Sequence, residues 1–295
     1  MNKTHIIITV ASWEDRFFLG LHKLIKEGSA RSVILYYFDG VFAEWSLPSR
    51  RKVARLCKAK GVELVESQLR FDQPRENWCR LEKDLEQSRL KYDRFTVQIS
   101  TMPRDIIWSC FWMLDYLHTK WDFVYDRPER YAKWLSRDPQ KPRLMYKMSG
   151  CTRLGAPTLL VLLLGLDFER AYQLIEYYEP TLLLVGTQSP RSYPGLEDAA
   201  IGHVECFRQM VPTRRFDVDA FSGDNGYSAV WDQLAKEGRA HNVVMSSLGP
   251  KPSAVALYHL VREHPDFGLA YPPSNEYNRH YSVGLSDSLR GSLQS

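Results

Sequence analysis

Residues 95–118, which read FTVQISTMPRDIIWSCFWMLDYLH, decide the fold class of this chain. Residues 95–99 form a short apolar run that is typical of a buried strand, and residues 105–118 form an apolar segment of helical length. Between them, residues 100–104 supply hydroxyls, a proline and an arginine immediately before the predicted helix. The stretch therefore predicts a strand, a short loop and a helix, which is the building unit of α/β sheets.

Strands and helices alternate in the same way along both halves of the chain. The predicted strands are apolar on both faces, as expected for parallel strands that helices cover on each side. Each half is therefore interpreted as a doubly wound α/β unit. The predicted strands are residues 5–10, 33–38, 62–65, 95–99 and 123–125 in the first half, and 158–164, 181–185, 215–218, 242–245 and 267–270 in the second.

One pair of loops indicates that the two halves are related. Residues 100–104 (STMPR) and 246–251 (SSLGPK) both read serine, a second hydroxyl, an apolar residue, proline and a cation, with one inserted glycine. Matching segments recur at a spacing of roughly 150 residues, which predicts two tandem Rossmann-like parallel-sheet units related by internal duplication. The alternative is that all doubly wound units show this alternation of strands and helices, whether or not they are duplicated. The predicted boundaries are a first unit at 1–126, a basic linker at 127–156, a second unit at 157–284 and a flexible tail at 285–295.

Composition is that of an ordinary globular protein. Of the 295 residues, 44% are hydrophobic and 25% charged, with a net charge of +4, which excludes disorder, collagen and coiled coil. The five cysteines form no C-x-x-C pair, which argues against a disulfide framework or a zinc finger and predicts a cytoplasmic protein. The first residues, MNKTHIIITV, carry no secretory signal, and no apolar run approaches the ~20 residues of a membrane-spanning helix.

A basic segment joins the two predicted units. Residues 127–153 contain eight lysines and arginines and two acids, which gives a local net charge of +6. One interpretation is a solvated linker. The other is a strip that contacts a nucleic-acid backbone through Arg137, Lys141 and Arg143, with Trp134 stacking a base.

Candidate ligand-binding residues lie where predicted strands end, because ligands of open parallel sheets bind beyond the carboxyl ends of the strands. Loops 100–104 and 246–251 lie there, and their hydroxyls and cations suit a phosphate. Capping of the following helix is the alternative for the hydroxyls. No G-x-G-x-x-G or P-loop motif is present, and no cofactor is expected. The predicted substrate and phosphate ligands are Ser100, Thr101, Arg104, Ser246, Ser247, Lys251, Gln188, Asn275 and Tyr271.

Three carboxylates that follow strands of the first half are candidates for catalysis. Asp15 follows the first strand, Asp39 the second and Asp126 the fifth. A carboxylate can orient water and stabilise an oxocarbenium-like centre, so cleavage of an N-glycosidic bond needs no metal. Asp39 is either catalytic or a turn residue, whereas Glu14 and Asp167 are interpreted as first-turn acids that face a helix dipole. The histidines show no H-E-x-x-H spacing, and no metal site is expected.

The strand, S-T-x-P-R loop and helix that begin at residue 99 resemble the ligand loop of CARF-type Rossmann proteins, which sense cyclic oligonucleotides in bacterial immunity. In that family the loop after a mid-sheet strand grips the ligand, and the domain usually works as a two-fold pair. The resemblance implies that Ser100, Thr101 and Arg104 contact an oligonucleotide, and that the repeat supplies the pair within one chain. The nuclease or winged-helix domain that the family usually carries is not found in this sequence, which favours an enzyme over a pure sensor.

Two function classes therefore stay open. The sequence favours a hydrolase of a nucleic acid or nucleotide that cleaves an N-glycosidic bond, like a DNA glycosylase, in antiviral defence. In this hypothesis the loops hold phosphates, aromatic rings stack the base and, for duplex DNA, the base is flipped into the cleft. The alternative is a CARF-like sensor that binds a cyclic or linear oligonucleotide without turnover. Both hypotheses expect a nucleic acid or nucleotide as the partner, and no membrane.

Overall fold

The computed structural model of the chain describes residues 5–28, 30–189 and 197–293. The chain divides into two compact units. Unit 1 consists of Met1–Ala132 and Arg279–Ser295, and unit 2 consists of Lys133–Asn278. The first and last segments of the chain thus fold together, and the division differs from the tandem cut expected near residue 126.

Unit 1 contains a six-stranded sheet of the order β16-β5-β4-β1-β2-β3. Its elements are β1 (His5–Val10), α1 (Asp15–Lys26), β2 (Ala30–Phe38), α2 (Gly40–Lys60), β3 (Glu63–Leu69), α3 (Pro74–Arg89), β4 (Arg94–Gln98), α4 (Arg104–Tyr116), β5 (Lys120–Asp126), β6 (Arg130–Tyr131), β15 (Ser282–Val283) and β16 (Ser288–Gly291). All neighbours in the sheet are parallel except β16 and β5, which are antiparallel. The central strand β1 is buried along its whole length, as its apolar sequence predicts.

Unit 2 contains a six-stranded sheet of the order β11-β10-β9-β12-β13-β8. Its elements are β7 (Ser136–Pro139), β8 (Arg143–Ser149), β9 (Thr158–Leu163), α5 (Phe168–Tyr178), β10 (Leu182–Gln188), α6 (Glu197–Met210), β11 (Thr213–Val218), α7 (Tyr227–Glu237), β12 (Asn242–Ser247), α8 (Pro252–Glu263), β13 (Gly268–Tyr271) and β14 (Ser274–Tyr277). Again the neighbours are parallel except at one edge, where β8 is antiparallel to β13.

The two sheets have the same topology. Strands β1 to β5 of unit 1 correspond in order to β9 to β13 of unit 2, and the antiparallel edge strand β16 corresponds to β8. The predicted fold class, two Rossmann-like parallel-sheet units in one chain, is confirmed. Identical strand orders, with an antiparallel strand at the same edge of each sheet, also favour the predicted duplication over the alternative that all doubly wound units alternate strands and helices in this way.

The two halves of the chain exchange their edge strands. After β5 the chain forms β6 in unit 1 and then β7 and β8 in unit 2, whereas after β13 it forms β14 in unit 2 and then β15 and β16 in unit 1. Within each unit the two crossing segments pair with each other, as β15 with β6 and as β14 with β7. The segment expected as a linker at 127–156 and the tail expected at 285–295 therefore both contain strands. Their polar composition hid this, because short edge strands lack the apolar pattern of central ones.

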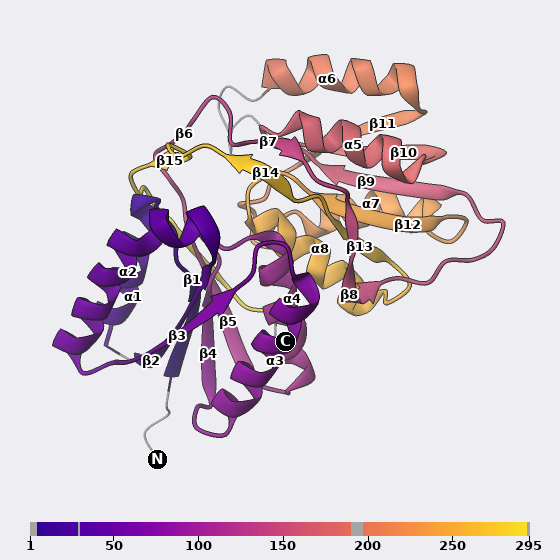
Figure 1. Ribbon diagram of the computed structural model, residues 1–295. Coiled ribbons are helices and arrows are strands. Elements are labelled where there is room, and N and C mark those ends of the chain that lie inside the picture. The colour runs from indigo at the N-terminus through magenta and orange to yellow at the C-terminus, as the bar shows by residue number, and fades with distance from the viewer. Residues whose placement is uncertain (1–4, 29, 190–196, 294–295) are drawn as a thin grey trace. The chain divides into compact units, whose positions relative to one another are not determined.

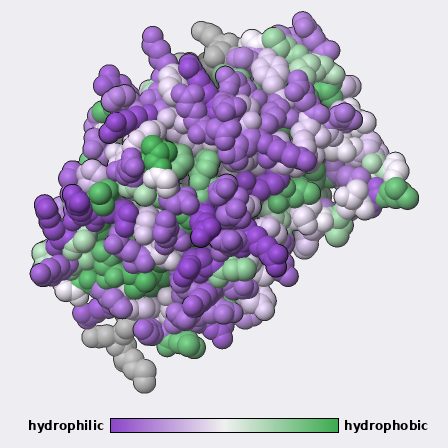
Figure 2. All heavy atoms as spheres, in the orientation of Figure 1, coloured by the Kyte–Doolittle hydropathy of each residue, from purple (hydrophilic) through white to green (hydrophobic). Residues whose placement is uncertain are grey.

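Helices cover both faces of each sheet (Figure 1). On one face of the unit 1 sheet, Phe17 and Leu21 of α1 and Val53 of α2 pack against Val33 and Leu35 of β2. The matching core of unit 2 is formed by α5 and α6 against β9 and β10. Figure 2 shows hydrophilic residues over most of the visible face, with small hydrophobic groups between them. Within the described residues, no helix has the length and apolarity that crossing a membrane requires.

The strand registers correct the loop alignment expected from the sequence. At the end of the central strands, Ala11 N–H donates to Tyr36 and Leu164 N–H donates to Gly186, so Ala11 corresponds to Leu164. Thr9 then corresponds to Leu162, which pairs with Ser246. In unit 1 the neighbour of Thr9 is Gln98, whose side chain accepts from the Thr9 hydroxyl at 2.9 Å. Ser246 therefore occupies the position of Gln98, and the match of Ser100 with Ser246 is wrong by two residues.

Deletion of residues 287–295 tests the strand exchange. The deletion removes β16, whose residues pair with β5 from Asp126 to Phe123. Unit 1 should lose about 3 kcal/mol of stability, the net contribution of roughly three hydrogen bonds. Amide hydrogen exchange should become faster in β5 and stay unchanged in β13. A shorter deletion of residues 294–295 is the control, and unchanged protection of β5 in the longer deletion would mean that this segment is the expected flexible tail.

Candidate functional site

The parallel strands of each sheet all end on the same side, which we call the carboxyl edge to distinguish it from the lateral edge strands β16 and β8. The loops at the carboxyl edge carry most of the residues selected from the sequence. In unit 1 these loops follow β1 to β5. In unit 2 they follow β9 to β13, and residues 190–196, after β10, lie outside the described part of the chain.

A buried polar network underlies the edge of unit 1. The Asp126 carboxylate is 1% exposed and accepts hydrogen bonds from Gln98 (3.1 Å) and Ser100 (2.9 Å). Ser288 of the edge strand β16 is a third donor to this carboxylate, at 2.7 Å. The Asp126 N–H donates back to Ser100 Oγ at 2.8 Å. Two predicted site residues, Ser100 and Asp126, are thus brought together in a closed network that fixes the loop after β4.

Unit 2 has other residues at the positions of this network. Leu162 stands in the position of Thr9, Ser246 in that of Gln98 and, by the register of β12 with β13, Pro272 in that of Asp126. Ser246 is fully buried, and its hydroxyl has no hydrogen-bond partner among the described residues. Unit 2 therefore has apolar residues at two positions where unit 1 has polar ones, and in this conformation Ser246 lies beyond the reach of a phosphate.

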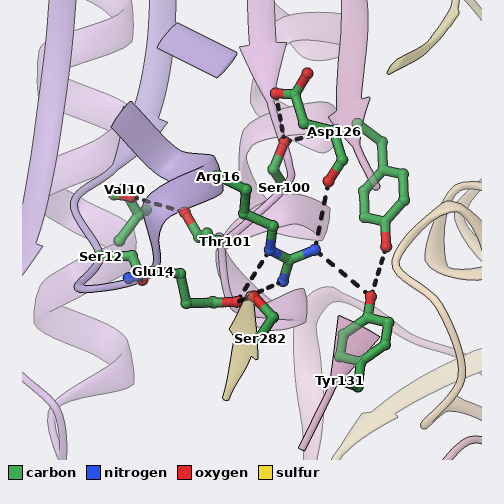
Figure 3. Close-up of polar contacts among 10 residues, drawn as sticks. Val10, Ser12, Glu14, Arg16, Ser100, Thr101, Asp126, Tyr131 and Ser282 are labelled. Carbon is green, nitrogen blue, oxygen red and sulfur yellow. Dashed lines mark hydrogen bonds and ion pairs between the residues drawn. The ribbon is translucent and has the colours of Figure 1, made fainter. Parts of the chain in front are cut away.

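A buried arginine links several segments at the edge of unit 1 (Figure 3). Arg16 is 1% exposed, and its Nε and Nη2 each lie 2.9 Å from Glu14 Oε2. Its Nη1 donates to the carbonyl oxygen of Asp126 at 3.4 Å and lies 3.5 Å from the Tyr131 hydroxyl. Ser282 of β15 donates to the same oxygen of Glu14. The guanidinium therefore ties the loop after β1 to the end of β5 and to both crossing strands of this unit.

The surroundings of Arg16 keep it charged. Burial lowers the pKa of Arg16, but the adjacent Glu14 carboxylate outweighs burial, and the pKa is raised well above its usual range. Burial also raises the pKa of Tyr125 well above its usual range, so its hydroxyl stays protonated and lies 2.7 Å from the Tyr131 hydroxyl. Arg16 is therefore a permanent cation whose charge Glu14 balances inside the protein.

Unit 2 repeats the arrangement with other residues. Arg170 of α5 donates through Nε to Asp167 Oδ2 at 2.7 Å and through Nη1 to the carbonyl oxygen of Pro272 at 3.1 Å. Ser136 of β7 donates to the same Asp167 oxygen. Both Arg170 and Asp167 are buried. We name the two sets the unit 1 latch (Glu14, Arg16 and Ser282) and the unit 2 latch (Asp167, Arg170 and Ser136).

The latches correct the interpretation of Glu14 and Asp167 as acids that only face a helix dipole. Each carboxylate is the buried partner of an arginine, although Asp167 also accepts from the Arg170 N–H as a helix cap. The sequence reasoning missed Arg16 and Arg170. Their signal is an acid followed within three residues by an arginine, directly after the first strand of each half.

Apart from Ser246, the hydroxyls of the two predicted phosphate loops bind the protein itself. Thr101 Oγ1 donates to the Val10 carbonyl oxygen at 3.2 Å and so joins the loops after β4 and β1. Ser247 Oγ lies 2.7 Å from Ser253 Oγ, which donates to the Pro250 carbonyl oxygen at 2.6 Å. These bonds close the loops, and none of them is a side-chain cap of the following helix, which was the alternative expected from the sequence.

The predicted cations lie at the starts of corresponding helices. Arg104 is the first residue of α4 and is buried, and Lys251 precedes α8 and is half-buried. Gln188, at the end of β10, accepts a backbone N–H through Oε1 at 3.2 Å, while its Nε2 has no partner among the residues described. A Cβ added at Gly249 would lie 3.1 Å from this Nε2, which places Gln188 beside the loop that precedes α8.

The other two candidate carboxylates lie on different loops from Asp126. Asp15 is exposed as the first residue of α1. Asp39 is half-buried before α2, and its Oδ1 accepts from the Phe71 N–H at 2.9 Å, a contact that suits the turn-residue alternative. In the part of the chain that the structure describes, no three His, Cys, Asp or Glu side chains are grouped so that they could hold a metal ion.

The cations of the basic strip lie over aromatic rings of unit 2. Asn275 bridges the crossing strands, because its amide binds Asp138 (2.9 Å) and Gln140 (2.5 Å). Arg143 pairs with Tyr271, so the start of β8 lies at the carboxyl end of β13. The cation–ring pairs are Arg137 over Trp134 (4.4 Å), Lys141 over Tyr177 (5.6 Å) and Arg143 over Tyr271 (5.1 Å).

Comparison with known proteins identifies the fold. No family model and no curated protein matches the chain. Among solved structures, a DNA nuclease of type III CRISPR defence that is activated by cyclic oligoadenylate matches 86% of the chain, with a TM-score of 0.54 and 11% identity. The chain shares the fold of this nuclease. It spans 63% of the nuclease's own length, and the resemblance expected from the S-T-x-P-R loop is confirmed at the level of fold.

Two other solved structures are more distant. A putative dehydrogenase from Burkholderia cenocepacia with bound NADP is 13% identical, with a TM-score of 0.29 over 69% of this chain and 77% of its own. A ketoreductase from a macrolactin assembly line is 9% identical, with a TM-score of 0.25 over 83% of this chain and 60% of its own.

Substitution of Arg16 by Met tests the unit 1 latch. It leaves Glu14 buried without its cation, which should cost about 3–5 kcal/mol, whereas the double variant with Glu14→Gln should recover part of this loss. Arg208→Met, which breaks an exposed pair with Glu205, is the control and should cost less than about 1 kcal/mol. Urea unfolding followed by circular dichroism measures all three, and equal midpoints for R16M and R208M would contradict a structural role of the latch.

Alanine substitution of the two serines tests the corrected register. Ser100→Ala should cost about 1–3 kcal/mol, because the Asp126 N–H and carboxylate lose a buried partner. Ser246→Ala should leave the free energy of unfolding unchanged or raise it, because it removes a buried hydroxyl without a partner. Similar losses in both variants would restore the equivalence expected from the sequence.

Proposed function

We propose that this protein is a sensor that binds oligonucleotides of the cyclic oligoadenylate type at the carboxyl edge of each sheet, without turning them over. The observation that carries this proposal is the fold shared with a nuclease activated by cyclic oligoadenylate, over 86% of the chain. The duplicated sheet supports it, because it gives two edges of the kind at which open parallel sheets bind ligands.

The surroundings of Asp126 and Asp39 favour a sensor over the N-glycosidase that the sequence favoured, whereas Asp15, the third candidate carboxylate, is exposed. A catalytic carboxylate must reach the substrate, and the Asp126 side chain is 1% exposed and already accepts three hydrogen bonds. One oxygen of Asp39 is taken by a backbone N–H. N-glycosidic cleavage in antiviral defence therefore stays a prediction, and the sensor is the function that we propose.

In this proposal the cations at the starts of α4 and α8 attract the phosphates. Arg104 and Lys251 lie where the dipole of each helix is positive, so both charges favour an anion there. The exposed cations Arg137 and Lys141 raise the positive potential of unit 2 and would speed association with a polyanion.

Calorimetric titration with cyclic tri-, tetra- and hexa-adenylate tests the proposed function. At least one of them should bind, and Arg104→Ala or Lys251→Ala should weaken its affinity about tenfold to a hundredfold, because a charge-assisted contact contributes roughly 1.5–3 kcal/mol. Lys236→Ala, an exposed lysine near the end of α7, is the control and should bind as the wild type does.

The same samples distinguish a sensor from an enzyme. Chromatography after incubation should recover the cyclic oligoadenylate intact. Release of adenine, from these ligands or from DNA and RNA, would instead support the N-glycosidase and contradict the sensor. No binding of any of the three ligands would contradict the proposed sensor.

A further inference from the structure

Five aromatic side chains gather at the edge of unit 1. Trp13 comes from the loop after β1, Phe38 ends β2, Phe42 and Trp45 lie in the first turns of α2, and Phe71 follows β3. All five are half-buried. We name them the edge cluster: Trp13, Phe38, Phe42, Trp45 and Phe71.

Each ring of the edge cluster contacts at least one other ring of the cluster. Trp13 and Phe42 are nearly parallel, with an interplanar angle of 19° and centroids 5.9 Å apart. Trp45 meets both of these rings edge-on, with centroids 5.0 Å from Trp13 and 5.8 Å from Phe42. Phe71 lies 4.9 Å from Phe42 on the other side. The cluster is therefore a continuous aromatic surface that spans the loops of three neighbouring strands.

The fold does not require these rings. In unit 2 the corresponding edge has Leu166 in the position of Trp13, by the match of Ala11 with Leu164. The terminal strand pairs, Phe38 with Leu69 and Gln188 with Val218, place Gln188 at the position of Phe38. The second residue after each outer strand is Phe71 in unit 1 and Ala220 in unit 2. The same topology thus forms with small or polar residues at this edge.

Two polar features of the edge cluster suit a nitrogen heterocycle. The Trp13 ring N–H is buried and has no hydrogen-bond partner within the described residues, a state that costs about 1–3 kcal/mol. The Arg279 guanidinium lies 5.9 Å from the centre of the Trp45 ring and adds a cation to this face. A purely apolar occupant would leave the Trp13 N–H unsatisfied, whereas a purine offers ring nitrogens that accept.

We propose that the edge cluster is a stacking site for a purine base, and that unit 2 lacks such a site. The inference rests on the proposed function and deepens it, because it assigns the base of the ligand to unit 1. Trp13 and Phe42 form an offset pair with centroids 5.9 Å apart, and a base inserted between them needs ring planes about 7 Å apart. In this proposal the two rings move apart to admit the base, which brings an acceptor to the Trp13 N–H.

Titration with adenosine 5′-monophosphate and, in parallel, ribose 5-phosphate tests the stacking site. The two probes share a sugar phosphate and differ in the base. The full chain should bind the monophosphate with the base more tightly, about tenfold or more, and binding should quench tryptophan fluorescence. Equal affinity for the two probes, or no binding of either, would overturn the inference.

Variants that place unit 2 residues in unit 1 locate the site. Trp13→Leu reproduces Leu166, and Phe71→Ala reproduces Ala220; each should remove most of the difference between the two probes. Circular dichroism shows whether each variant folds. If Trp13→Leu does not fold, Phe71→Ala tests the stacking site in its place. Trp231→Leu is the control, because this ring stacks on His264 in unit 2 and should leave the difference unchanged.

The outcomes separate this inference from the proposed function. If cyclic oligoadenylates bind the wild type and both edge-cluster variants equally, the stacking site is wrong and the sensor stands. If adenosine 5′-monophosphate binds through Trp13 but no cyclic oligoadenylate binds, the stacking site stands and the sensor is wrong.

Discussion

The sheet of unit 1 is completed only by the last segment of the chain, because its antiparallel edge strand β16 follows the whole of unit 2. Unit 2 takes its own edge strand, β8, from the segment that follows β5. The rest of the structure follows from this constraint. The crossing segments must be held where they enter each unit, and the two latches do so by burying an ion pair against a serine of a crossing strand. An ion pair suits this task because it is directional and its loss is costly.

The two units share one architecture but differ in the polar and aromatic residues at corresponding positions. Unit 1 keeps a buried carboxylate network and an aromatic edge, whereas unit 2 has leucine and proline in the core positions and a glutamine amide at the edge. Core substitutions that conserve packing are tolerated by a fold, whereas residues at the carboxyl edge are set by what binds there. The asymmetry of the edges is therefore the feature of this chain from which its ligand is best inferred.

The sequence predicted the fold class well and the site only in part. Buried central strands such as His5–Val10 and Thr158–Leu163 have continuous apolar runs, which is a strong local signal. The crossing strands escaped prediction because β6 and β15 are two residues long and pair across more than half of the chain. Arg16 escaped because its partners, Glu14 apart, are distant in sequence. The sequence predicted Ser100 and Asp126 as two separate site residues but not their contact, because no local pattern indicates that the ends of two strands meet.

The strand exchange also has a consequence for how the protein is made on the ribosome. Unit 2 is one continuous stretch, Lys133–Asn278, so all of its strands are present before synthesis reaches β16. Unit 1 is begun first and finished last, because β5 waits for a partner that is translated about 160 residues later, at roughly 10 residues per second. During that interval β5 is an open edge able to pair with other nascent chains.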